Sequence, residues 1–240
     1  MKKTRSPWDG QRETLDDLSE AVHYNRWIYS NVERYLGRRV LEVGCGTGNL
    51  TGFFARGRKV LAVDIHEGYL RAAKKRWGGE PRISFGRYDL KRGLGDFRAF
   101  KPDTLVTVNV LEHIEGDQKF IEAAYGLLPP GGRLLVFVPA FQWLYGSMDK
   151  SYGHHRRYTK RTLNQKLSQA GFRVEYCRYL NLLGVFGWWV NGKLLGRKII
   201  PKAQMLLYDR ILKYVTPVEK YLPKPLGLSL LSVGVKAPSR

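Results

Sequence analysis

Apolar runs and amphipathic segments alternate through the middle of this 240-residue chain. Five short apolar-rich runs each predict a buried strand: residues 39–43, 60–65, 82–90, 103–111 and 133–139. Three segments between them have the apolar spacing of helices: residues 48–56, 67–77 and 117–128. Nearly continuous apolar strands separated by helices are typical of a parallel sheet that helices cover on both faces.

The two ends of the chain depart from this alternation. Residues 12–36 carry apolar side chains at helical spacing and predict one or two amphipathic helices. After the fifth strand, Thr159 is placed to cap a further helix. Residues 172–180 then alternate like a strand, and residues 228–237 predict a final one. We therefore expect additions to the central sheet at both ends of the chain.

Composition favours one domain with these additions. At 240 residues and 43% hydrophobic, the chain can bury a proper core. We predict an N-terminal helical lid over residues 1–38, then one domain over 39–240 with substrate-side insertions at 141–158 and 181–226. Two cysteines suggest no disulfide framework, which favours a cytoplasmic location. The longest run without a charged residue is 15 residues (134–148), whereas a membrane-spanning helix needs about 20.

Positive charge is concentrated in the last third of the chain, although the whole sequence has a formal net charge of +20. Residues 1–149 hold 23 basic and 18 acidic residues, a balance of +5. Residues 150–240 hold 18 basic and 3 acidic residues, a balance of +15. Such a field attracts phospholipids, phosphorylated substrates or nucleic acid, and the alternative is a charge that serves solubility alone.

A glycine-rich turn, LEVGCGTGNL (residues 41–50), follows the first predicted strand. A phosphate-binding P-loop needs a Lys followed by Ser or Thr after its glycines, and no such pair is present. The dinucleotide fingerprint G-x-G-x-x-G is not matched either, because Asn49 stands where its last glycine belongs. The Glu42 carboxylate would also repel a pyrophosphate. S-adenosylmethionine, which carries a sulfonium and an ammonium, meets neither objection.

Acidic residues after the next two strands suit the rest of that molecule. Asp64 ends the second strand, 20 residues after Gly44, where a carboxylate can accept hydrogen bonds from two ribose hydroxyls. Asp89 can accept from the adenine amino group, with Ile65 and Leu90 against the faces of the ring. The alternative is an ordinary strand–helix turn, which would not need the carboxylate of Asp64.

On these motifs the chain resembles the class I S-adenosylmethionine-dependent methyltransferases. The resemblance rests on VLEVGCGTGNLT, VLAVDI, YDL, TLVTVNVLEHI and LLPPGGRLLVFVP, and it covers about residues 39–179 and 228–237. It implies an α/β fold with a Rossmann-like, doubly wound, seven-stranded sheet, mostly parallel with the last strand antiparallel. It also implies S-adenosylmethionine as cofactor, with Asn109 and Val110 near its methionine end. The expected cofactor-binding residues are Glu42, Gly44, Cys45, Gly46, Gly48, Asp64, Ile65, Asp89, Leu90, Asn109 and Val110.

A dense group of His, Arg and Tyr in residues 147–159 follows the fifth strand, at the sheet edge where α/β proteins bind ligands. His154 or His155 can take a proton from a hydroxyl acceptor near neutral pH. Arg156 and Arg157 can hold a phosphate or carboxylate. The alternative is a surface loop with solvated histidines and with arginines that pair with local acids.

His113, in the LEHI motif, is a further candidate, with capping or packing of its loop as the alternative. No carboxylate–histidine cluster has clear ligand spacing along the chain, so we expect no metal. The candidate catalytic residues are His154, His155, Arg156, Arg157, Tyr152 and His113.

The segment 181–226 mixes apolar, aromatic and basic residues. Trp188 and Trp189 lie near Lys193 and Arg197, a combination typical of a helix in a membrane interface. Glycines interrupt the helical spacing, however, which favours a cap on the core or on a second subunit. Both interpretations stay open.

Together these features predict an S-adenosylmethionine-dependent methyltransferase. Its expected acceptor is a small anionic or amphiphilic molecule, including a lipid or lipid-linked one, met in the cytoplasm or at the inner membrane face. The first alternative is a methyltransferase of RNA or another nucleic acid, although no NPPY-like motif follows the fourth strand and no RNA-binding module is recognisable. The second is a non-catalytic, cofactor-binding regulatory protein. The methylated atom and the oligomeric state stay open.

Overall fold

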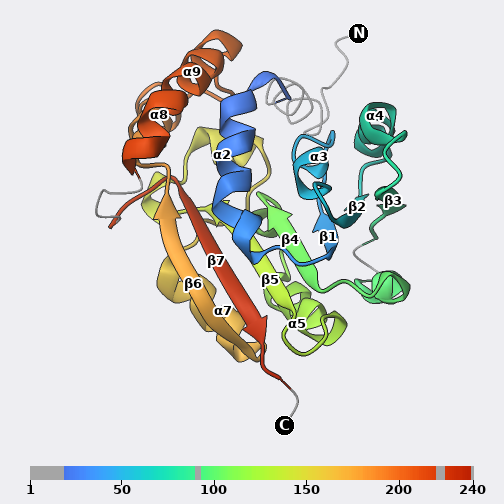
Figure 1. Cartoon of the computed structure of the whole chain (residues 1–240). Coiled ribbons are helices and arrows are strands. Elements are labelled where there is room, and N and C mark those ends of the chain that lie inside the picture. Colours follow the sequence, from blue (N-terminus) through green and yellow to red (C-terminus); the bar gives the residue numbers. More distant parts are fainter. Residues whose placement is uncertain (1–18, 90–92, 220–224, 239–240) are drawn as a thin grey trace, which may run out of the picture.

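The computed structural model describes residues 19–89, 93–219 and 225–238 (Figure 1). Its strands form one seven-stranded sheet in the order β3-β2-β1-β4-β5-β7-β6. Their bounds are β1 Arg39–Val43, β2 Lys59–Asp64, β3 Ile83–Arg87, β4 Thr104–Val108, β5 Arg133–Pro139, β6 Phe172–Leu180 and β7 Ser229–Lys236. Strands β1 to β5 pair in parallel, and β7 runs antiparallel to both β5 and β6. The predicted mostly parallel sheet with an antiparallel last strand is confirmed.

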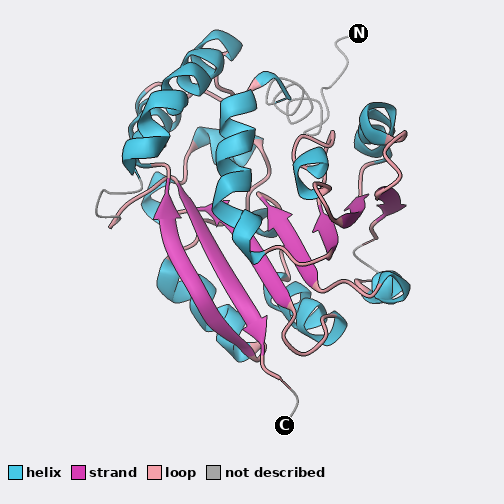
Figure 2. Ribbon diagram, viewed as in Figure 1, coloured by secondary structure: helices cyan, strands magenta, loops and turns pink. Residues whose placement is uncertain are grey.

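Helices lie on both sides of this sheet (Figure 2). The α-helices are α2 Val22–Val32, α3 Thr51–Phe54, α4 Glu67–Trp77, α5 Asp117–Leu127, α6 Ser147–Ser151, α7 Lys160–Gln169, α8 Leu182–Trp189 and α9 Lys202–Glu219. Shorter turns are the 3-10 helices η1 Glu33–Tyr35, η2 Gly95–Phe100, η3 Leu111–His113 and η4 Gln142–Leu144, and the π-helix η5 Val190–Leu194. The predicted cap of α7 is also confirmed, because the Thr159 side chain accepts the Thr162 N–H.

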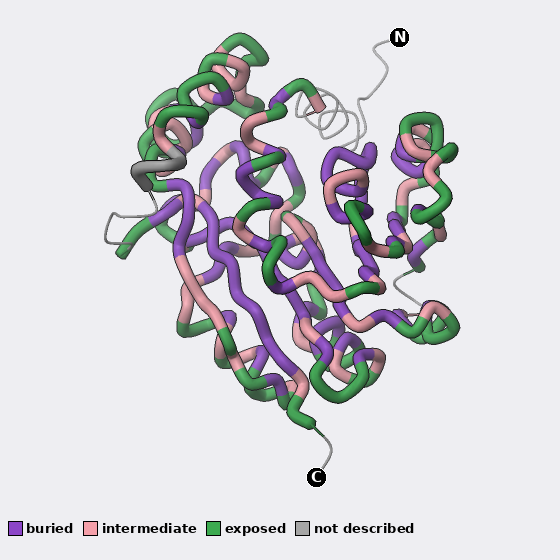
Figure 3. Tube along the Cα trace, in the orientation of Figure 1, coloured by how far each residue is buried: buried purple, intermediate pink, exposed green. Residues whose placement is uncertain are grey.

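Two hydrophobic cores separate the sheet from its helices. One contains Ile121 of α5 and Leu163 of α7. The other contains Ile28 of α2, Phe54 of α3 and Leu70 of α4. The central strands are buried along their length (Figure 3), because both of their faces meet a core. This explains why their sequences read as continuous apolar runs and not as an alternation.

The additions gather at the end of the sheet to which the parallel strands point (Figure 1). Helix α2 packs against α9, and the Tyr24 N–H donates to Asp209 Oδ1 at 2.7 Å. The predicted insertion at 141–158 holds two short helices, η4 and α6, that the sequence pattern did not indicate. Helix α6 begins where the Gly146 N–H donates to Asp149 Oδ2 at 2.9 Å.

In the described part of the chain no helix is long and apolar enough to cross a membrane.

Parts of three predictions fall outside the described residues: 1–18 of the expected lid, Leu90 of the expected adenine pocket, and 220–224 of the second insertion. The domain boundaries themselves stay a prediction.

Candidate active site

The turn after β1 holds its three glycines in left-handed backbone. Gly44, Gly46 and Gly48 have φ angles of 78°, 54° and 81°. A Cβ on Gly44 would lie 2.2 Å from Val110 Cγ2, so no side chain fits there without a shift of the loop after β4. Two of the segments expected to bind the cofactor therefore meet at this point.

Asp64, at the end of β2, is tied to the same turn. It is buried, and its Oδ2 accepts the Gly46 N–H while its Oδ1 accepts the His66 N–H, both at 2.9 Å. Burial raises the pKa of Asp64, and these N–H donors oppose that rise. A carboxylate has further lone pairs, so it can still accept hydrogen bonds from ribose hydroxyls.

The remaining adenine-side residues differ in exposure. Ile65, next to Asp64, is 39% exposed and free to face a ring. Asp89 is exposed beyond β3. Cys45 is buried, and its backbone N–H donates to Val63 O at 3.0 Å, which fixes the start of the turn. Burial raises the pKa of the Cys45 thiol, so it is not a reactive thiolate.

Glu42 is buried beneath the glycine turn. Its Oε2 accepts the Thr51 hydroxyl at 2.7 Å and so joins β1 to α3. Burial raises the pKa of Glu42 to about 8, and the charge of Asp64 adds to this rise. A cation bound nearby would favour the ionised form, as the ammonium of the expected cofactor would.

Asn109, after β4, has a left-handed backbone, with a φ of 52°. Its N–H donates to Phe137 O at 2.8 Å. Positive φ in a residue other than glycine is uncommon and often marks a functional site. The Tyr24 side chain of α2 is hydrogen-bonded to Asn109, and desolvation raises the pKa of Tyr24 to about 12. Sequence reasoning missed Tyr24, because only the packing of α2 brings it to this edge.

Beyond Asn109, His154 lies between two buried carboxyl groups. Its Nδ1 is 2.8 Å from Asp149 Oδ1 and its Nε2 is 3.9 Å from Glu112 Oε1. The His113 ring meets the His154 ring edge-on, with centroids 4.7 Å apart. His155 is exposed, and its contact with this group is the backbone N–H that donates to Glu112 O at 2.9 Å. The structure thus separates two histidines that the sequence left as equal candidates.

Glu112 is fully buried, yet neither of its carboxylate oxygens has a hydrogen-bond partner. Burial raises the pKa of Glu112 to about 7, although the charges of His154 and Arg157 oppose that rise. Burial also lowers the pKa of His113, to about 4. The sequence contains no strong signal for Glu112 beyond its place in the LEHI motif, and none for Asp149.

The expectation of no metal rested on spacing along the chain, and it stays a prediction, although the tertiary structure gathers groups that this spacing does not reveal. Ligand atoms of Glu112, His113 and His154 all lie within 4.8 Å of one another. The fold brings this carboxylate and two imidazoles together from the loops after β4 and β5.

Both arginines of the 147–159 segment bind carboxylates of the protein itself. Arg156 Nη1 is 2.9 Å from Asp117 Oδ2. Arg157 is buried, with its Nε 2.8 Å from Asp149 Oδ1 and its guanidinium 4.6 Å from the centre of the Trp188 ring. This arrangement is the alternative in which the arginines pair with local acids, and it differs from the expected anion clamp.

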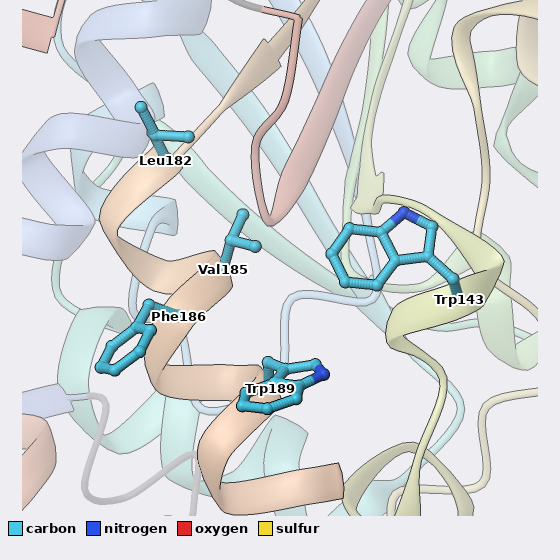
Figure 4. Close-up of a pocket in the computed structure, with 5 residues that line it drawn as sticks. All are labelled: Trp143, Leu182, Val185, Phe186 and Trp189. Atoms are coloured by element: carbon cyan, nitrogen blue, oxygen red, sulfur yellow. The ribbon is translucent and has the colours of Figure 1, made fainter.

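An apolar hollow of about 340 Å³ opens between α8 and η4 (Figure 4). Val185 and Trp189 point from α8 toward Trp143 of η4. The residues that line the hollow are Trp143, Leu182, Val185, Phe186 and Trp189. Tyr152 lies between the histidine group and α8, because its ring centre is 5.9 Å from that of His154 and 6.4 Å from that of Trp188.

Comparison with known proteins agrees with the geometry of the glycine turn. A family model described as a methyltransferase domain matches residues 41–134. A probable S-adenosylmethionine-dependent methyltransferase of Mycolicibacterium smegmatis is 30% identical over 188 residues, which cover 75% of this chain and 68% of that relative. The mitochondrial ubiquinone biosynthesis O-methyltransferase of Schizosaccharomyces pombe is 29% identical over 57% of this chain, and the match spans 51% of that relative.

A solved structure is similar in fold. Phosphoethanolamine N-methyltransferase 2 of Haemonchus contortus, in complex with S-adenosylmethionine, superposes with a TM-score of 0.56 at 17% identity. The match covers 84% of this chain and 49% of that one.

Proposed function

Because the chain belongs to the S-adenosylmethionine-dependent methyltransferase family, we propose that it methylates a hydroxyl group of a small amphiphilic, anionic acceptor at a membrane surface. The apolar hollow between α8 and η4 is the observation that carries this proposal. The name of the Schizosaccharomyces pombe relative, an O-methyltransferase, favours oxygen as the methylated atom.

The residues of the glycine turn fit S-adenosylmethionine. Gly44, Gly46 and Gly48 keep the turn in left-handed backbone, and Asp64 has lone pairs for the ribose hydroxyls. When bound, this cofactor supplies an already activated methyl group. The protein therefore has chiefly to hold the acceptor in line with that group and to exclude water.

The acceptor's polar end belongs near His154 in this proposal. His154 Nδ1 is 2.8 Å from Asp149 Oδ1, and its Nε2 faces Glu112 at 3.9 Å. The loop that carries Glu112 begins with Val110, whose side chain meets Gly44 of the cofactor turn. An acceptor oxygen at the histidine group would therefore lie beside the cofactor site.

The acceptor's apolar part fits the hollow on α8. Phe186 of α8 and Leu194 of η5 are 70% and 67% exposed, which are high values for large apolar side chains. Lys193 and Lys198 are exposed in the same segment. Apolar and aromatic side chains interspersed with lysines are the composition with which peripheral helices bind anionic membranes.

An acceptor panel tests this function. Release of S-adenosylhomocysteine should occur with a phenol that carries a long alkyl chain, and should fall sharply with the same phenol without the chain and with RNA. Phe186→Ser should raise KM for the long-chain phenol by about tenfold, because a buried Phe contributes about 1.5–3 kcal/mol. The control is Tyr214→Ser on α9, where the side chain is 72% exposed but lies outside the hollow. Turnover with RNA alone, or equal KM values in both variants, would contradict the proposal.

A further inference from the structure

The buried group of Glu112, His113 and His154 has the composition of a metal site. Their ligand atoms lie within 4.8 Å of one another. Both oxygens of Glu112 lack a hydrogen-bond partner although the side chain is fully buried. A buried carboxylate without a partner is costly unless a cation or a proton compensates it.

The second carboxylate of the group is placed where metal sites usually have one. Metal-binding histidines commonly donate their other ring N–H to a carboxylate, which fixes the tautomer and the orientation of the ring. His154 Nδ1 is 2.8 Å from Asp149 Oδ1, so its Nε2 is the free ligand atom and faces Glu112. Asp149 is in turn held by Arg157 at 2.8 Å and by the Gly146 N–H at 2.9 Å.

The charges of the group also suit a dication. Glu112 and Asp149 are two potential negative charges, and Arg157 is the positive charge that contacts Asp149. With neutral imidazoles, this buried group has a net charge of about −1. A bound divalent cation would change that balance to about +1 and give Glu112 the partner that it lacks.

We propose that Glu112, His113 and His154 bind one divalent transition-metal ion of the Zn²⁺ type. Two imidazoles and one carboxylate suit zinc and its neighbours, whereas Mg²⁺ and Ca²⁺ prefer oxygen ligands alone. Three protein ligands leave one position of a tetrahedral site open. Ligand atoms around zinc lie about 3.4 Å apart, so the three side chains need to close by roughly an ångström.

The open position gives the ion a role that rests on the proposed function. An acceptor hydroxyl bound there has a lowered pKa and loses its proton to water. Its oxygen then forms a bond to the methyl carbon while the carbon–sulfur bond of the donor breaks. In this arrangement His154 is a metal ligand and not the general base expected from the sequence.

Metal binding by the full chain, without any acceptor, tests the site. The chain is freed of metal with a chelator and titrated with Zn²⁺ by calorimetry and with Co²⁺ by visible absorption. We expect one ion per chain, and Glu112→Gln and His154→Asn should each weaken binding by at least about tenfold. His155→Asn is the matched control, because that exposed neighbour is outside the group and should leave affinity unchanged.

Binding of S-adenosylmethionine to each variant shows that the chain is folded. If Glu112→Gln does not fold, His113→Asn replaces it. A folded, cofactor-binding chain that binds no Zn²⁺ or Co²⁺, or that binds them equally well in both ligand variants, overturns the site. Stoichiometric metal binding in a chain that methylates no acceptor supports the site and contradicts the proposed function. Turnover that persists in excess chelator overturns the catalytic role of the ion.

Discussion

The cofactor end and the acceptor end of this molecule are built in different ways. The cofactor end is formed mainly by backbone. Three glycines with positive φ follow one strand, and a single carboxylate from the next strand accepts a hydrogen bond from the turn. At the acceptor end, side chains from η3, from α6 and from the loop after α6 meet through ion pairs and ring contacts. The first end is local in sequence, whereas the second depends on packing between distant segments.

The difference shows which changes each end tolerates. A backbone turn is sensitive to any side chain that fills its space, and it depends little on the identity of side chains elsewhere. A buried charge network is sensitive to the loss of one member, because the others are then left without compensation. The predictions below separate these two kinds of dependence.

The largest effect should come from Asp149→Asn, at the acceptor end. The change removes the charge that compensates fully buried Arg157, so the free energy of unfolding should fall by about 3–5 kcal/mol. Urea unfolding measures it. Asp117→Asn is the control, because its partners Arg156 and Lys166 are both 28% exposed and should regain water. Equal losses in the two variants would show that the acceptor end is not more sensitive.

Gly44→Ala should be the most damaging single change at the cofactor end. The new Cβ would lie 2.2 Å from Val110 Cγ2 at a φ of 78°, so the turn must shift. We expect the affinity for S-adenosylmethionine, measured by calorimetry, to fall by about 30-fold or more, or about 2 kcal/mol. Gly57→Ala is a matched control with a φ of 71° and nothing within 4 Å of the added Cβ. Similar affinities in both variants would mean that backbone strain alone decides the outcome.

Neutralising Lys193 and Lys198 should weaken membrane binding and leave the cofactor end unchanged. Each lysine near an anionic surface contributes about 1 kcal/mol, so the double change to Gln should lower binding to phosphatidylglycerol-containing vesicles by about 30-fold. Sedimentation with vesicles measures this. Lys74→Gln with Lys75→Gln, two exposed positions on α4, is the control pair. An equal loss for the control pair would indicate a general charge effect and no membrane-binding surface.

The smallest effect at any single step of pH should be the dependence contributed by Glu42. Its pKa is about 8 in the folded chain against an ordinary value of 4.5, so the folded state holds a proton that the unfolded state releases between these values. The stability that this proton contributes is therefore present below about pH 4.5 and is lost as the pH rises through 8. The slope is at most about 1.4 kcal/mol per pH unit.

Glu42→Gln should remove that slope, as measured by the free energy of unfolding of the cofactor-free chain across this pH range. Glu122→Gln, an exposed position on α5, should leave it unchanged. A slope that persists in Glu42→Gln would assign the pH dependence to other groups.

The sequence predicted the central sheet closely because its strands are buried on both faces. The bounds of β1, β5 and β6, and of helix α4, coincide with those expected from apolar patterning and turn residues. The glycine turn and Asp64 were also predictable, because strand, turn and carboxylate follow one another at short spacing. Helices η4 and α6 were not, since their short sequences carry no helical period, and α6 also begins at a contact between Gly146 and Asp149.

The candidate acceptor site divides in the same way. His154 and His155 are neighbours with the same chemistry, and only the position of Asp149 distinguishes them. The sequence does not indicate a partner for Arg156 or Arg157, but in the structure each forms an ion pair with a carboxylate. Tyr24 and Glu112 reach the site through the packing of α2 and η3, which no local pattern encodes.

By itself, the sequence determined the fold class, the cofactor and the backbone turn that receives it, because these follow from local hydrophobic period and from glycine positions. Only the tertiary structure decided which side chains meet at the acceptor end. It selects the histidine that faces the carboxylates and the carboxylates that pair with the arginines. It also brings Glu112, His113 and His154 into one group. The physical reason is the separation along the chain of the residues that interact. Backbone conformation is specified by neighbouring residues, whereas the energy of a buried charge depends on whatever the fold places within a few ångströms of it.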